Sequence, residues 1–134
     1  MTTKFITAAT KLMRIREQFD CGAINAVESN RARETALADS LKYLAAEYAV
    51  ALEYPLRING QGEFRIVARR SVGQPSSFGA VPFGENFSTI LSRHRPRTET
   101  VAGAHSLSEN VACYMSHFDV EALVREQMAA RLHL

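Results

Sequence analysis

The side chains best suited to chemistry in this sequence are arginines, and they concentrate in the middle of the chain. Residues 56–97 contain seven arginines against two carboxylates, whereas residues 98–134 contain two arginines against five carboxylates. A guanidinium group binds carboxylates and phosphates through paired hydrogen bonds. The sequence therefore predicts that the middle of the chain presents a surface for an anionic or protein partner.

Two phenylalanines stand within this basic region, in a stretch rich in glycine and proline, residues 71–86. A connection of this length in a compact domain is often a binding loop. Burying a phenylalanine is worth about 1.5–3 kcal/mol, so we expect each to pack against the body of the domain or against a partner. Aromatic residues and arginines are also enriched among the residues that dominate protein interfaces. The predicted partner-binding residues are Arg57, Arg65, Arg69, Arg70, Phe78, Phe83, Arg93, Arg95 and Arg97.

Two functions fit such a surface. The favoured prediction is a non-enzymatic module that binds a protein partner, for instance a small inhibitor or regulator of the phage-inhibitor, antitoxin or immunity type, by analogy of class alone. The alternative is a nucleic-acid-binding protein in which the arginines, including those of the RHRPR segment at 93–97, contact phosphates and the two phenylalanines stack on bases. A formal charge of only +2 and the lack of a recognised nucleic-acid motif favour the protein partner.

Cys113 and His117 are four residues apart, a spacing that puts both side chains on one face of a helix. Such a pair can ligate zinc or form an activated thiolate. A structural zinc site takes four ligands, and the sequence offers no second close pair, so we predict neither a metal nor another cofactor. We expect Cys21 and Cys113 to be free and buried, as cysteines are in a reducing compartment.

Recognised catalytic motifs are absent from the sequence, which contains no GxSxG, no HExxH, no P-loop and no GxGxxG ahead of a helix. Gly60 and Gly62 fit a hairpin turn better than a phosphate-binding loop, because no helix is predicted after them. We therefore do not expect an enzyme. An active site assembled from distant residues is the remaining alternative.

The elements that must position the basic surface begin with two helices. Apolar residues at spacings of three and four predict a first helix that starts after Thr2 or Thr3 and ends at Gly22. The same pattern predicts a long second helix over residues 29–54, which Pro55 ends. Joined by a short connector, the two form an antiparallel helical hairpin. Their apolar stripes are Phe5, Ala8, Leu12, Ile15 and Phe19 in the first helix and Leu37, Leu41, Leu44, Tyr48 and Ala51 in the second.

The long helix carries a second row of residues, Tyr43, Ala46, Val50 and Tyr54. This row offers a face for self-association, so a homodimer is an alternative first partner. A broad core stripe is the competing interpretation, because central helices are often buried on most sides.

After Pro55 the apolar period changes from that of a helix to that of a strand. Two alternating runs flank the sequence Asn-Gly-Gln-Gly at 59–62, and Asn-Gly tolerates the positive φ angles of tight turns. We predict a β-hairpin over residues 56–70. Its apolar face, which covers the helices, is formed by Leu56, Ile58, Phe64, Ile66 and Ala68, and its opposite face presents Arg57, Arg65 and Arg69.

The C-terminal part is predicted to be mainly helical. Asn86 caps a short helix over 87–94, a short strand follows at 98–101, and a helical stretch opens at Ser106 or Ser108. Asp119 then caps a last helix, whose C-terminal end carries the cations of Arg131 and His133. The predicted apolar sides are Phe87, Ile90 and Leu91 in the short helix, Val111, Tyr114, Met115 and Phe118 in the helical stretch, and Val120, Leu123, Val124 and Met128 in the last helix.

Together these elements predict one α+β domain over residues 1–134, with an N-terminal antiparallel helical hairpin, a small antiparallel β-sheet and a C-terminal helix. No stretch approaches the ~18 apolar residues of a membrane span, and charges interrupt the N-terminal stretch that a signal peptide would keep apolar. The expected setting is cytoplasmic, with no membrane partner.

Overall fold

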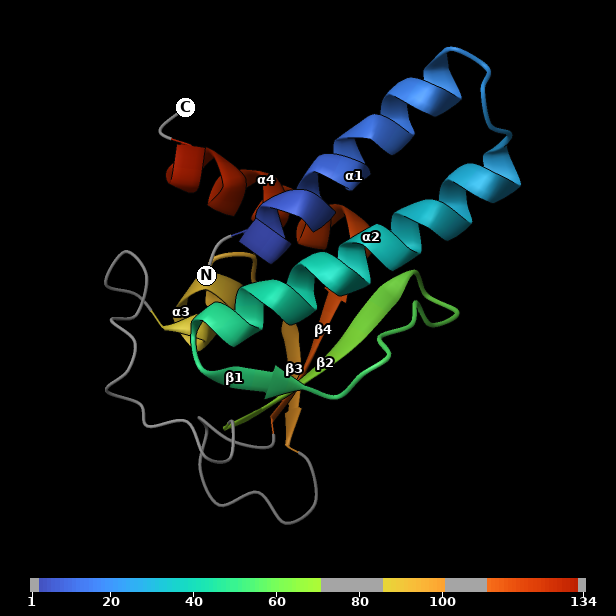
Figure 1. Ribbon diagram of the computed structural model, residues 1–134. Helices are drawn as coiled ribbons and strands as arrows, with labels where there is room; N and C mark the ends of the chain where they lie inside the picture. Colours follow the sequence, from blue (N-terminus) through green and yellow to red (C-terminus); the bar gives the residue numbers. More distant parts are fainter. Residues whose placement is uncertain (1–2, 71–85, 101–110, 133–134) are drawn as a thin grey trace.

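The computed structural model describes residues 3–70, 86–100 and 111–132, and Figure 1 shows their arrangement. It is an α+β fold with an N-terminal helical pair, a small antiparallel sheet and a C-terminal helix, which confirms the predicted class. The elements in chain order are α1 (Thr3–Asp20), α2 (Ala26–Glu47), β1 (Val50–Leu52), β2 (Glu63–Arg70), α3 (Phe87–Ser92), β3 (Arg97–Thr100), β4 (Val111–Ser116) and α4 (His117–Leu132).

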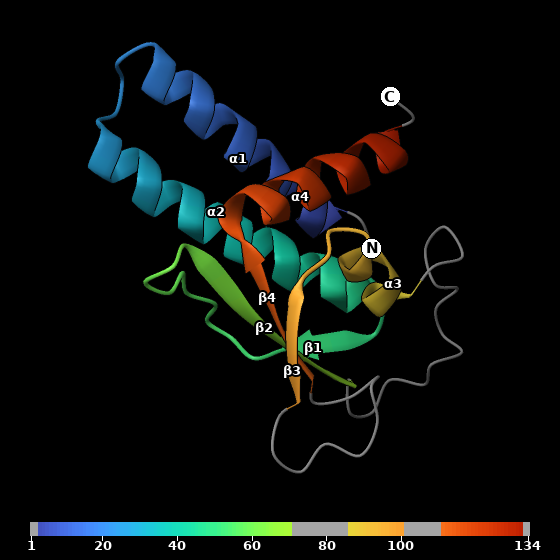
Figure 2. The same cartoon turned by 180° about the vertical axis from the view of Figure 1, so that it is seen from behind.

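The molecule has a helical layer on one face of a four-stranded sheet. The strand order is β1-β2-β4-β3, and every neighbouring pair is antiparallel. Helices α1, α2 and α4 lie on the same side of the sheet in both views (Figures 1 and 2). The joined ends of α1 and α2 project beyond the sheet (Figure 1). This projection leaves part of the helical pair without a strand beneath it.

One hydrophobic core lies between the helical layer and the sheet. Phe64 and Ile66 of β2 and Met115 of β4 point into it and are fully buried. The predicted inward face of the 56–70 segment is therefore right where its side chains are described. From the helices the core receives Phe5, Leu12, Leu37, Leu41, Leu44, Phe87, Ile90, Leu91, Val120, Leu123, Val124 and Met128.

The α1–α2 pair forms largely as its sequence predicts. Gly22 adopts a φ of +81° after α1, the left-handed conformation expected of a helix-ending glycine. Asn25 caps α2, because its side chain accepts a hydrogen bond from the Glu28 amide while the Glu28 carboxylate accepts one from the Asn25 amide. Phe19 is a correction to the predicted stripe: its side chain is exposed because it lies in the last turn of α1, at the projecting end.

The predicted helix over 29–54 is wrong at its C-terminal end. Helix α2 stops at Glu47, and Ala49 takes a φ of +59°, which no α-helix continues. The next three residues form β1 and pair with β2. Their backbone N–H and C=O groups therefore form hydrogen bonds in the sheet in place of those that a longer helix would have provided. Val50 and Tyr54 therefore lie beyond the helix, and the predicted self-association row of 43, 46, 50 and 54 is not a helical face.

The predicted hairpin over 56–70 is only half formed. The turn at Asn59 is present, with the Gly62 amide donating to the Asn59 carbonyl and Gly62 at a φ of +76°. On its N-terminal side, however, a single bridge joins Ile58 to Phe64. The strand partners of β2 are instead β1 and β4, because an eight-residue strand gains a complete hydrogen-bond ladder only from neighbours on both sides.

The predicted helical stretch before Phe118 is also wrong where it is described. Residues 111–116 form β4, which pairs with β2 on one side and β3 on the other. Helix α4 then begins at His117, and the Ser116 hydroxyl rather than Asp119 caps it, by accepting a hydrogen bond from the Asp119 amide. The buried side of α4 is the predicted one, with Gln127 added.

The short elements near the middle of the chain follow the prediction more closely. The Asn86 side chain accepts from the Thr89 amide and caps α3, which ends at Ser92, two residues earlier than expected. The predicted strand at 98–101 is β3, which begins at Arg97. Val101, Ser106 and Ser108 lie outside the described residues.

Candidate partner-binding surface

Two of the predicted arginines lie close together on the outer face of the sheet. Successive side chains of a strand point to opposite faces, so the neighbours of the buried Phe64 and Ile66 point away from the helices. In register, Arg65 of β2 and Arg97 of β3 stand opposite Tyr114 of β4, one on each side. The Arg97 guanidinium lies 4.0 Å from the centroid of the Tyr114 ring, within reach of a cation–π interaction. The pKa of Arg65 is raised, chiefly by its hydrogen bond to the Tyr114 hydroxyl. We call these three residues the Arg–Tyr–Arg row.

Each arginine of the row is paired with a carboxylate. Arg65 Nη1 donates to Glu53 Oε2 at 2.8 Å, and Arg97 Nη2 donates to Glu63 Oε1 at 3.0 Å. Exposed ion pairs of this kind add at most about 1 kcal/mol to stability. Their main effect here is electrostatic, because they leave the surface close to neutral while keeping it rich in hydrogen-bond donors.

The arginines of the RHRPR segment do not share one surface. Arg93 Nη2 lies 2.5 Å from Glu126 Oε1 of α4, and His94 Nε2 lies 3.1 Å from the other oxygen of the same carboxylate. Arg95 is exposed at a φ of +49°. Only Arg97 reaches the Arg–Tyr–Arg row, so this segment divides between the helical layer and the sheet.

The remaining predicted residues lie elsewhere. Arg57 is exposed in the segment between β1 and β2. The pKa of Tyr54 is raised, chiefly by its hydrogen bond to Asp39, and the Arg57 charge partly opposes this rise. Arg69 and Arg70 lie at the end of β2, opposite Ala51 and Val50 in the register. The two phenylalanines predicted as anchors, Phe78 and Phe83, lie outside the described residues.

The predicted helical Cys113–His117 pair does not form, because Cys113 lies in β4 and His117 opens α4. Burial raises the pKa of the half-buried Cys113 thiol, which disfavours the thiolate that metal binding or nucleophilic attack needs. Cys21 was predicted to be buried and is exposed, since it lies in the connector at the projecting end of α1. Within residues 3–70, 86–100 and 111–132, no three His, Cys, Asp or Glu side chains are placed to hold a metal ion.

His117 is the residue of this region with a distinct electrostatic environment. It lines a cavity of about 530 Å³ between α2 and the turn at 58–62. Its pKa is lowered, first by burial and then by the Arg33 charge. The neighbouring Glu121 is partly buried, which raises its pKa, but hydrogen bonds from Arg33 and Arg125 outweigh the burial and lower it overall. Protonating His117 therefore adds a charge that this region disfavours.

We expect His117 to make the fold less stable as the pH falls below 6.5, its ordinary pKa. The folded state disfavours the imidazolium, so the unfolded chain binds this proton more readily than the folded one. The contribution of His117 to the free energy of unfolding is therefore complete above pH 6.5 and is lost as the pH falls below it. The His117→Gln variant should lose less stability than the native chain between about pH 7 and about pH 5.5, as measured by urea unfolding. Glu121 acts only at lower pH, so parallel profiles for the two proteins over this range would contradict the assignment.

In the comparisons with known proteins, no family model, no curated protein and no solved structure matches this chain. Among the described residues, no helix has the length and apolar character needed to span a membrane.

Proposed function

We propose that this chain is a non-enzymatic protein-binding module and that the Arg–Tyr–Arg row on the outer face of the sheet is its contact surface. The observation that carries the proposal is the placement of Arg65 and Arg97 on either side of Tyr114. Arginine and tyrosine are the residue types most enriched among binding hot spots, together with tryptophan. Regular strands also hold the row, so a partner would not have to order the backbone beneath it.

The flanking carboxylates favour a protein over a nucleic acid as the partner. Glu53 and Glu63 already neutralise the two guanidinium groups. A phosphate backbone would have to displace them, whereas a protein surface with mixed charges can form hydrogen bonds to both members of each pair. Nucleic-acid binding through the same arginines is the alternative. A cytoplasmic setting completes the proposal, supported by the two free thiols.

The proposal is tested by comparing what three forms of the full chain retain from a cell extract. The Arg65→Ala/Arg97→Ala variant removes both ends of the row. The matched control, Arg16→Gln/Arg125→Gln, removes two exposed, ion-paired arginines from the helices. We expect specific proteins to bind the native chain and the control, with at least about tenfold less bound by the row variant.

Three outcomes decide against the proposal. The first is equal retention by the row variant and the control, and the second is the absence of any specifically retained protein. The third is a high ratio of absorbance at 260 nm to that at 280 nm that nuclease treatment removes. This result would show that the purified chain carries nucleic acid and would favour nucleic-acid binding instead. Circular dichroism of each variant separates a lost contact from a lost fold.

A further inference from the structure

We propose that the groove between α1 and α2 is a second docking surface, which binds an acidic amphipathic helix of another protein. The groove has a volume of about 610 Å³, and the described residues that line it all belong to α1 or α2. It lies on the opposite side of the helical pair from a smaller cavity of about 290 Å³ that α4 residues help to line. The argument rests on its floor, its charge and its length.

The floor of the groove is apolar and is made partly by small residues. Ile15 of α1 and Ala36 of α2 are buried there, and Ala32 is half-buried one turn away from Ala36. Two alanines four residues apart leave a channel along one face of α2, because neither side chain extends past its Cβ. Val27 continues this apolar strip to the projecting end, where it is largely exposed.

Cations without carboxylate partners border this floor. Lys11, Arg14 and Arg31 are exposed, and none forms an ion pair with any residue in the described part of the chain. The groove contains two carboxylates, and both already accept hydrogen bonds: Glu28 from the Asn25 amide and Asp39 from the Tyr54 hydroxyl. Seven other arginines differ from these cations because each lies within an ion pair: Arg16, Arg33, Arg65, Arg93, Arg97, Arg125 and Arg131. Arg57 and Arg95 are exposed and, among the described residues, also lack a carboxylate partner, but neither lines the groove.

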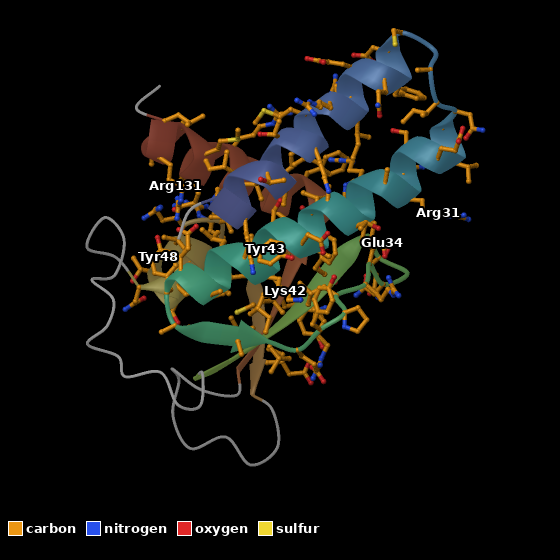
Figure 3. All side chains as sticks on the ribbon, viewed as in Figure 1. Arg31, Glu34, Lys42, Tyr43, Tyr48 and Arg131 are labelled. Carbon is orange, nitrogen blue, oxygen red and sulfur yellow. The ribbon has the colours of Figure 1, made fainter. Side chains whose placement is uncertain are left out.

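Positive charge continues past the Asp39 end of the groove. The Lys42 ammonium lies 4.2 Å from the centroid of the Tyr54 ring, and the Lys4 ammonium lies 5.8 Å from that of Tyr43. With Lys11, these are the three lysines of the chain, and all lie on α1 or α2. Figure 3 shows Arg31 near the projecting end of α2, with Lys42 and Tyr43 farther along the same helix.

The length of the groove matches a short helix. Its α2 wall runs from Val27 to Asp39, a rise of about 18 Å at 1.5 Å per residue. A partner helix of about 12 residues would lay its apolar stripe along the floor and set carboxylates against the cations at the rim, the helix-in-groove mode of recognition. A phosphate backbone would gain nothing from the apolar floor, which favours the acidic helix.

The test uses a fluorescein-labelled synthetic peptide of fourteen residues with leucines on one helical face and glutamates on the others. Two control peptides carry lysine in place of glutamate or the same composition in scrambled order. We expect the acidic peptide to bind the full chain with a Kd in the micromolar range, to weaken with added salt and to bind better than both controls, as measured by fluorescence anisotropy.

Variants then locate the binding. Arg14→Gln/Arg31→Gln should weaken it at least about tenfold, whereas Arg16→Gln/Arg125→Gln removes as much charge from outside the groove and should leave it unchanged. Arg65→Ala/Arg97→Ala should also leave it unchanged, so this surface and the Arg–Tyr–Arg row succeed or fail separately. Circular dichroism checks that each variant is folded.

The inference is overturned if the acidic peptide does not bind, if a control peptide binds as well, or if the two arginine-to-glutamine pairs behave alike. It is also overturned if light scattering shows the chain alone to be a dimer that Arg14→Gln/Arg31→Gln dissociates, because the occupant would then be a second copy.

Discussion

Replacing Arg131 with methionine should lower the free energy of unfolding by about 3–5 kcal/mol, one of the two largest losses we expect from a single change. The Arg131 and Glu47 side chains form an ion pair between α4 and α2 in which each is only 3% exposed. Removing the guanidinium leaves the Glu47 carboxylate buried without its ion-pair partner. Urea unfolding of the native chain and of Arg131→Met measures the difference.

The surroundings of this pair explain why the loss should be large. Arg131 Nη1 also donates to the carbonyl and side-chain oxygens of Gln127, at 2.9 Å each, and its guanidinium lies 4.8 Å from the centroid of the Phe5 ring. The Tyr48 hydroxyl donates to the same Gln127 side chain. Figure 3 shows Arg131 and Tyr48 at the same end of the molecule. One guanidinium thus joins α1, α2 and α4.

A double variant separates the buried charge from the shape of the side chain. Glu47→Leu/Arg131→Met removes both charges, and it also removes Glu47 Oε2, a buried oxygen with no hydrogen-bond partner among the described residues. Because buried ion pairs are often replaced by apolar residues at little cost, we expect it to recover most of the lost stability. A double variant as unstable as Arg131→Met would show that the network, rather than the uncompensated charge, stabilises this end.

The second large effect is expected from Phe64→Ala, which should cost about 3–5 kcal/mol. Phe64 is fully buried in β2, opposite Met115 of β4, and is part of the core under the helical layer. Truncation removes the whole ring and leaves a cavity that a sheet paired on both sides of β2 cannot easily close. Urea unfolding at constant m-value is the measurement.

Phe118 provides the matched control for that change. Its side chain is 67% exposed and contacts Arg33 and His117 at the surface. We expect Phe118→Ala to cost less than about 1 kcal/mol. Similar losses in the two variants would contradict the placement of Phe64 in the core.

The parts of the fold that the sequence predicted well are those with long periodic patterns. The stripe of α1 as far as Ile15 and the buried side of α4 were readable because a helix repeats its inward positions over several turns. The cap at Asn86 and the helix end at Gly22 were readable because each depends on one residue type in one backbone conformation.

The errors arose where local preference and tertiary pairing disagree. The end of α2 runs into an alanine-rich segment with high helix propensity, yet Val50 pairs with Arg70 in the sheet. Residues 111–116 are too few to distinguish the period of a strand from that of a helix, although valine and tyrosine favour a strand. Two neighbouring strands determine their structure as β4.

The sequence predicted which residue types form the candidate surface, but not which residues lie next to one another on it. Arg65 and Arg97 stood out by residue type, but Tyr114, which lies between them, was assigned to a helix. The carboxylate partners of Arg93 and Arg131 are 33 and 84 residues away in the chain, so no spacing rule could reveal them. The groove cations could not be predicted from the sequence, because Lys11, Arg14 and Arg31 become a group only when the packing of α1 on α2 places them around one groove.

The most direct test of the central claim is amide hydrogen exchange of the full chain with and without a protein that the capture experiment identifies. We predict slower exchange in β2, β3 and β4 around Arg65, Arg97 and Tyr114 when the partner is bound. No change in these strands, with slower exchange confined to α1 and α2, would contradict the claim and assign the contact to the groove instead.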